Sequence, residues 1–365
     1  MSQILTFFGQ SRSQCATASV AIARNLAQQG ATVLWLTQAG SPLLKALWGR
    51  PLPAEVYAVA PNLWTLQLQA TVLLEESWEV VKTLEMQYLR SPLLKQVFGQ
   101  ELVVLPGMDD ALALNTLREL YDAGTYDYLI FDGQSSQATL RMWGLPENLD
   151  WYIRRFQIVL QMSELAQALS PFIQPIASAI LNISGSQASL NQPLKQTRSL
   201  LDAGRSAVKS PEKVLGFLVT TDSPVDIEVA RYFWGSSQQI GLTVGGVVAF
   251  LNNAAVLPES SFAPLSIHPM PCLQGDDWQP LIAAAPSIQT ASQNAPAPVV
   301  INEAEKQVRL FLPGFTKEEI TLTQYGPEVT VTAGDQRRNL FLPESLKNRA
   351  VRGAKFQDDY LIVSF

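Results

Sequence analysis

Residues 7–17 read Phe-Phe-Gly-Gln-Ser-Arg-Ser-Gln-Cys-Ala-Thr. They follow an apolar run, Ile4–Phe8, and precede residues 18–28, in which apolar side chains recur at roughly helical spacing. The pattern predicts a strand, a tight turn and a helix. In nucleotide-binding proteins such a turn holds phosphate with backbone N–H groups, and it supplies a lysine and a hydroxyl for magnesium. This turn has the right place in the chain, but it contains no lysine.

The composition is that of a folded globular protein. The chain has 365 residues, of which 47% are hydrophobic and 16% charged, which fits two or three domains. The net charge of -6 and the lack of a basic stripe argue against binding of nucleic acid.

Metal and membrane sites are not expected. Two cysteines without a CxxC and a single histidine give no basis for a zinc site within the chain. No basic segment precedes the first apolar run, and no apolar stretch reaches membrane-spanning length. We therefore expect a cytoplasmic protein that is not an integral membrane protein.

The first part of the chain predicts a mostly parallel α/β sheet. Apolar runs at 4–8, 31–36, 62–68, 101–105, 128–131, 214–221 and 243–250 are interpreted as strands, with helical patterns between most of them. The run 128–131 ends at Asp132. An acid there can hold a magnesium-bound water, or it can equally bind a neighbouring loop.

Residues 150–209 have a helical character and look inserted between strands. An apolar stripe at helical spacing is more often core than binding groove. These residues nevertheless carry more large apolar side chains than two short helices need, which keeps a surface for hydrophobic clients as the alternative. The candidates for client binding are Trp151, Tyr152, Phe156, Met162, Phe172 and Ile176.

The C-terminal part changes its pattern. Residues 286–298 are rich in Ala, Pro, Ser and Gln and read as a semi-extended linker. Residues 299–365 mostly alternate between apolar and polar side chains, which predicts a small all-β sandwich. The predicted domains are thus 1–285, with a helical subdomain at about 150–209, and 299–365.

Several strings in residues 1–285 resemble the family of arsenite-pump ATPases and tail-anchored-protein-targeting ATPases, which are P-loop NTPases with a deviant phosphate loop. Residues 131–141, Phe-Asp-Gly-Gln-Ser-Ser-Gln-Ala-Thr-Leu-Arg, resemble the second switch of the family. Residues 106–111, Pro-Gly-Met-Asp-Asp-Ala, resemble its Pro-Gly-x-Asp-Glu segment. The resemblance implies a nucleotide site for ATP or ADP with magnesium.

The C-terminal part resembles the α-crystallin domain of small heat-shock proteins. Leu-Pro-Gly-Phe at 312–315, Leu-Pro-Glu at 342–344 and Ala-Lys-Phe at 354–356 carry the resemblance. Both modules in one chain are typical of the photosynthetic-lineage branch of the targeting ATPases, found in cyanobacteria and plastids. The link 331–339 is too short for the strand that small heat-shock proteins exchange, so we expect this module to pack on its own first domain.

The departures from the family concern the nucleotide site. Where the family has Gly-Lys-Gly-Gly-Val-Gly-Lys-Thr-Thr, the chain has Gly9, Gln10, Ser11, Arg12, Ser13, Gln14, Cys15, Ala16 and Thr17. Gln38 replaces the acid that positions water in the first switch. Loss of several such contacts together predicts that hydrolysis is silenced. The zinc that clamps the family's dimers is not expected either, although a zinc-free homodimer stays open.

Three functions follow as hypotheses. The leading one is a chaperone-like, non-catalytic or very weakly catalytic relative of the targeting ATPases that binds hydrophobic helical clients. The second is a working ATP hydrolase with an altered site formed by Arg12, Thr17 and a catalytic Asp132. The third is a scaffold that binds neither nucleotide nor client.

Overall fold

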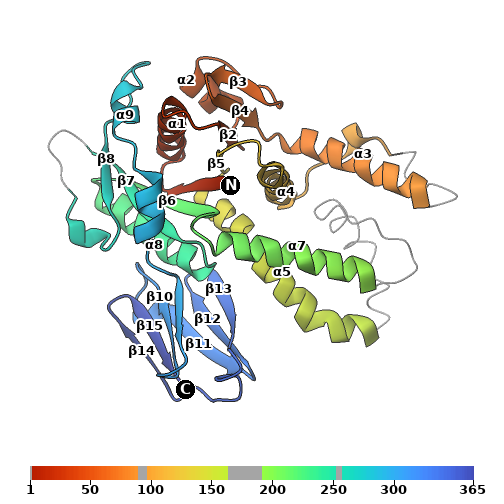
Figure 1. Cartoon of the computed structure of the whole chain (residues 1–365), viewed down its shortest axis with the longest axis vertical. Helices are drawn as coiled ribbons and strands as arrows, with labels where there is room; N and C mark the ends of the chain where they lie inside the picture. The colour runs from red at the N-terminus through yellow and green to blue at the C-terminus, as the bar shows by residue number, and fades with distance from the viewer. Residues whose placement is uncertain (1, 89–96, 163–190, 252–256) are drawn as a thin grey trace.

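The computed structural model describes residues 2–88, 97–162, 191–251 and 257–365 (Figure 1). Within this part of the chain, an eight-stranded sheet carries helices on both faces, and a separate antiparallel β unit follows it. The prediction of a mostly parallel α/β sheet followed by an all-β sandwich is confirmed.

The large sheet has the strand order β3-β4-β2-β5-β1-β6-β7-β8. Neighbouring strands are parallel except for the edge pair β3 and β4. The central strands are apolar throughout because helices cover both of their faces. Its strands are β1 (Gln3–Gly9), β2 (Val33–Thr37), β3 (Tyr57–Ala60), β4 (Leu63–Gln67), β5 (Tyr128–Asp132), β6 (Val214–Thr221), β7 (Val244–Phe250) and β8 (Ile267–Met270).

Two apolar cores lie on the two faces of this sheet. The helices that contribute to one core are α1 (Arg12–Gln28), α2 (Ser41–Trp48), α9 (Gln279–Ala283) and α10 (Ile288–Asn294). Those that contribute to the other are α4 (Met108–Ala123), α5 (Ser136–Met162), α7 (Asn191–Val208) and α8 (Pro224–Gln239), with α3 (Ala70–Tyr88) packed beside α4. In the part of the chain that the structure describes, no helix is long and apolar enough to cross a membrane.

Two local predictions differ from the structure. Residues 101–105 form no strand: the short 3-10 helix Gly99–Glu101 is followed by irregular chain, and Val103 and Leu105 are exposed. An apolar run becomes a buried strand only where neighbouring strands pair with it. Residues 286–298 are also not extended throughout, because α10 buries Ile288 and Ala291 against the large sheet.

The C-terminal unit consists of two antiparallel sheets with a core of their own. One has the order β14-β15-β10-β9 and the other β11-β12-β13. Alternate residues along β12 and β15 are buried between the sheets, as the period of two predicts. The strands are β9 (Val299–Asn302), β10 (Gln307–Phe311), β11 (Ile320–Tyr325), β12 (Glu328–Ala333), β13 (Gln336–Phe341), β14 (Gly353–Gln357) and β15 (Tyr360–Ser364).

This β unit packs against α8 of the first domain, as Figure 1 shows. The Trp234 ring meets Phe311 edge-on at 5.2 Å between centroids. Gly235 allows the close approach, because a Cβ atom there would lie 2.2 Å from the Pro313 carbonyl oxygen. The C-terminal unit is therefore docked on its own chain.

Candidate functional site

The carboxyl ends of β1, β2 and β5 meet at one edge of the large sheet. Thr37 ends β2 and is the register partner of Asp132, which ends β5. Gly9 ends β1, and α1 begins three residues later at Arg12. In parallel α/β sheets, ligands bind at the carboxyl ends of the strands. The preferred place is the point where the strand order reverses, so that the connections from two adjacent strands run in opposite directions. The structure therefore brings the predicted residues Gly9 and Asp132 to this edge.

The connection from β1 to α1 is shorter than expected, since only Gln10 and Ser11 separate strand and helix. Ser11 caps the helix by accepting the Gln14 N–H at 3.4 Å. The predicted turn over residues 9–17 is thus wrong in its length. Residues 13–17 belong to the helix. Residues 10–17 contain no glycine, the residue that adopts the left-handed backbone conformations of a tight phosphate loop.

Arg12 binds the Asp132 carboxylate with both terminal nitrogens of its guanidinium. Arg12 Nη1 donates to Oδ1, and Nη2 donates to Oδ2 at 2.7 Å. The Thr37 hydroxyl also donates to Oδ2 at 2.7 Å, and it accepts the Ala39 N–H at 2.9 Å. Asp132 is only 2% exposed. Both of its carboxylate oxygens are therefore hydrogen-bonded to side chains of the protein and not to solvent.

The electrostatics of the two buried acids in the site follow from this packing. Burial raises the pKa of Asp132, while the Arg12 charge and the Arg12 and Thr37 hydrogen bonds oppose the rise. Burial also raises the pKa of the Cys15 thiol to about 12, and the Asp132 charge adds to that effect. Cys15 is therefore a protonated core residue and not a nucleophile at neutral pH.

Ser136 fixes the end of β1. Its Oγ accepts the Gly9 N–H at 2.9 Å and donates to the Gly9 carbonyl at 2.8 Å. On its other side, Gly9 lies so close to β6 that a Cβ atom would be 2.3 Å from the Val219 carbonyl oxygen. The backbone at the start of the candidate loop is thus held from two directions.

Gln38 bridges two neighbouring segments of the site. Its Nε2 donates to Asp110 Oδ1 at 3.3 Å, and its Oε1 accepts the Gln134 N–H at 3.1 Å. Burial raises the pKa of Asp110, the Asp109 charge adds to the rise, and the Gln38 hydrogen bond opposes it. The role of Ser136 and the Thr37 contact to Asp132 escaped the sequence interpretation, since neither residue stands in a motif that names its partner.

The remaining predicted nucleotide residues do not converge. Gln10 and Ser13 are exposed, whereas Cys15 and Ala16 face the apolar core. The Thr17 hydroxyl donates back to the Ser13 carbonyl at 2.8 Å, within the helix. Over the described residues, no group of three or more His, Cys, Asp or Glu side chains is placed to hold a metal ion.

The predicted client residues are only partly described. Trp151 donates its indole N–H to Glu328 of β12 at 3.0 Å, so it faces the C-terminal unit. Tyr152 is 55% exposed. Phe156 and Met162 lie on α5, but their side chains are outside the description, and Phe172 and Ile176 lie outside the described residues. Among described side chains, Phe98, Val103 and Leu105 are the most exposed large apolar groups near α3 and α4.

Comparison with protein families gives matches for both parts of the chain. Residues 3–260 match the profile of the anion-transporting ATPases. Residues 303–365 match the profile of an HSP20-like domain found in ArsA. Together the two matches cover the large sheet except its edge strand β8, and the docked β unit except its edge strand β9.

Individual relatives align along much of the chain. A protein from Chlorobaculum tepidum, named "Putative arsenical pump-driving ATPase", is 22% identical over 398 residues, covering 100% of this chain and 96% of the relative. A protein from Aquifex aeolicus with a similar name is 19% identical and covers 83% of each chain. An uncharacterised protein from Streptomyces coelicolor is 27% identical and covers 73% of this chain and 72% of its own.

Proposed function

The chain belongs to the family of anion-transporting ATPases, and from this premise we infer that it is a member that does not turn over ATP. The observation that carries the proposal is the engagement of Asp132 by Arg12 and Thr37. The acid that would hold a magnesium-bound water is already neutralised and hydrogen-bonded by the fold.

The residues present do not fit a magnesium nucleotide. Backbone N–H groups of a glycine-rich loop are what hold phosphates in such sites, but only Gln10 and Ser11 join β1 to α1. The Arg12 guanidinium is the cation in the site, and its two terminal nitrogens are directed at Asp132. Gln38, at the position of the water-positioning acid, is engaged with Asp110 and Gln134.

Phosphate release by the full-length protein tests the lack of turnover. We expect the steady-state rate with ATP and magnesium to equal that of Asp132→Ala under the same conditions. A rate above background that Asp132→Ala abolishes would instead identify a working ATP hydrolase. A melting-temperature scan with ATP or ADP plus magnesium separates binding from turnover, because a ligand of the folded state raises stability by RT ln(1 + [L]/Kd).

The second part of the proposal is that the protein binds hydrophobic helical segments, as a targeting factor for tail-anchored proteins does. Its support is the apolar character of residues 150–176 together with the exposed Phe98, Val103 and Leu105. Exposed large apolar groups are typical of binding surfaces when they gather in one region. A helix that presents one apolar face would bury these groups without requiring nucleotide.

Client binding is tested with a fluorescent transmembrane-segment peptide. We expect suppression of its aggregation by the wild type, and weaker suppression by Val103→Ser with Leu105→Ser. A matched control is Val300→Ser with Ile301→Ser, which removes exposed apolar groups from the β unit. If the wild type does not suppress aggregation, client binding is excluded. If ATP and ADP also leave the melting temperature unchanged, the results support the scaffold that binds neither nucleotide nor client.

A further inference from the structure

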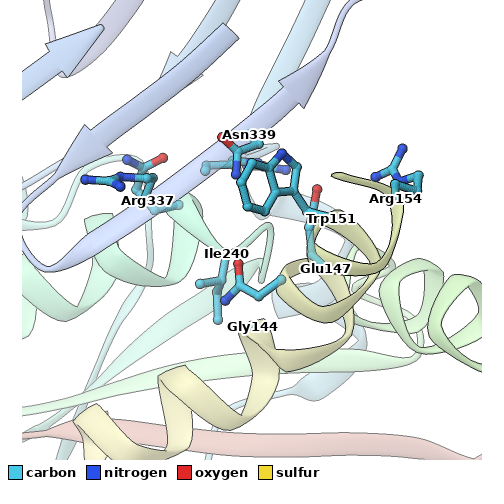
Figure 2. Close-up of a pocket in the computed structure, with 10 residues that line it drawn as sticks. Gly144, Glu147, Trp151, Arg154, Ile240, Arg337 and Asn339 are labelled. Carbon is cyan, nitrogen blue, oxygen red and sulfur yellow. The ribbon is translucent and has the colours of Figure 1, made fainter. Parts of the chain in front are cut away.

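A small pocket lies between the two domains, away from the β1 and α1 connection. Figure 2 shows Glu147, Trp151 and Arg154 of α5 on one side and Arg337 and Asn339 of β13 on the other. The internal volume is about 10 Å³, which is close to the space that one water molecule requires. The pocket therefore has room for a single-atom ion or one water, and not for a nucleotide or a phosphate.

Arg338 is the unusual member of this pocket. The residue is 5% exposed, and its Nη1 donates to the Gln238 carbonyl at 2.9 Å. Its buried Nε has no hydrogen-bond partner among the described residues, and no carboxylate lies within ion-pair distance in the same part of the chain. Burial lowers the pKa of Arg338, and the Glu147 charge opposes that fall without a direct ion pair. An anion placed against the guanidinium would therefore stabilise the folded state.

Two of the acids near the pocket form ion pairs with cations other than Arg338. Both oxygens of Glu147 receive Lys209 Nζ, at 3.1 and 2.9 Å. Asp150 pairs with Arg154 at 2.7 Å and with Arg205 at 3.1 Å. Burial lowers the pKa of Lys209, and the Arg338 and Arg205 charges lower it further, while Glu147 opposes them. Glu147 and Asp150 thus form their ion pairs with these cations and not with Arg338.

We propose that this pocket binds a halide ion, with chloride as the physiological case. Arg338 supplies the charge. Asn339 lines the same pocket, and its Oδ1 accepts the Thr330 hydroxyl at 2.7 Å, so its amide nitrogen remains as a donor. Because the ion would contact β13 and neutralise a charge that faces α5 and α8, it fastens the C-terminal unit to the first domain.

Urea unfolding of the full-length protein tests the site. We compare sodium chloride with sodium gluconate at constant ionic strength, so that general screening is the same in both. The expected result is a saturable stabilisation, in which the unfolding constant falls about tenfold when chloride is about nine times its Kd. Equal stability in the two salts at every concentration would overturn the proposal.

Variants separate the site from a general salt effect. Arg338→Met is expected to abolish the chloride dependence, whereas Arg352→Met, which removes an exposed charge from the same unit, leaves it intact. Glu147→Gln removes the competing negative charge and is expected to lower the chloride Kd several-fold. An unchanged or higher Kd in Glu147→Gln contradicts the assignment, even if Arg338→Met fails to fold.

Crystals grown in sodium bromide give a readout that needs no variant. The expected result is an anomalous bromide peak within contact distance of Arg338 and Asn339. A well-ordered crystal that has no bromide peak in this pocket would show that the site does not take a halide.

Discussion

The Arg12 guanidinium and the Asp132 carboxylate face each other fork to fork, although 120 residues separate them in the chain. Arg12 is the first residue of α1, and Asp132 is the last of β5. The parallel pairing of β1 with β5 brings the two elements together. A pair of this geometry is both strong and specific, so the fold supplies its own cation at the edge of the sheet.

Asp132→Asn should destabilise the protein, because it leaves the Arg12 charge without its partner. We expect a loss near the lower end of the roughly 3 to 5 kcal/mol typical of broken buried pairs, since the Arg12 side chain is 28% exposed. Urea unfolding followed by tryptophan fluorescence measures the effect. Asp335→Asn is the matched control, because its pair with Arg141 is exposed and should be worth at most about 1 kcal/mol. Equal losses in the two variants would contradict the role assigned to Arg12.

Cys15 should be unreactive in the folded protein. Burial raises its pKa to about 12 from 9.0, so the thiolate is scarce at neutral pH. A raised pKa of an acid contributes stability below the unfolded value, and that contribution is lost as the pH rises above 9 toward 12. At pH 8 a thiol reagent should modify the exposed Cys272 and spare Cys15 until urea unfolds the chain. Rapid modification of both thiols in the native state would show that the α1 region opens readily.

Gly9→Ala should be among the most damaging substitutions near the site. The added Cβ would lie 2.3 Å from the Val219 carbonyl oxygen, which forces β1 and β6 apart in the centre of the sheet. We expect a loss of about 3 kcal/mol or more, measured by urea unfolding. Gly353→Ala is the control, since no atom lies within 4 Å of its added Cβ. A similar, small effect of both changes would mean that β1 and β6 are farther apart than described.

The central strands of the large sheet were predictable because they are apolar along their whole length and are bounded by turns. The exposed run 101–105 has the same composition but no pairing partner, which periodicity cannot reveal. The short edge strands β3, β8, β9 and β14 escaped prediction for the opposite reason. Their residues are mostly exposed or half-buried, so they carry little apolar pattern.

The chemistry of the candidate site was less predictable than its place. The sequence indicates that Gly9 and Asp132 lie at the same edge of a parallel sheet. It does not show that Ser11 caps the helix, which starts α1 at Arg12. Because α1 starts at Arg12, the Arg12 side chain, which the sequence places in a loop, points at Asp132, 120 residues away in the chain. Such a contact depends on strand register and helix phase together, and neither can be obtained from spacing within residues 7–17.

Gly235→Ala tests whether the C-terminal unit is held on α8. In an exposed helix, alanine in place of glycine stabilises by up to about 1 kcal/mol. Here the added Cβ would lie 2.2 Å from the Pro313 carbonyl oxygen and 2.6 Å from the Phe315 ring, so we expect destabilisation and partial undocking instead. Limited proteolysis between residues 284 and 299 and the fluorescence of Trp234, which packs on Phe311, report the undocked form. A stabilised variant with unchanged cleavage would contradict the docking. Alanine can stabilise α8 through its helix preference only if the β unit does not lie against residue 235.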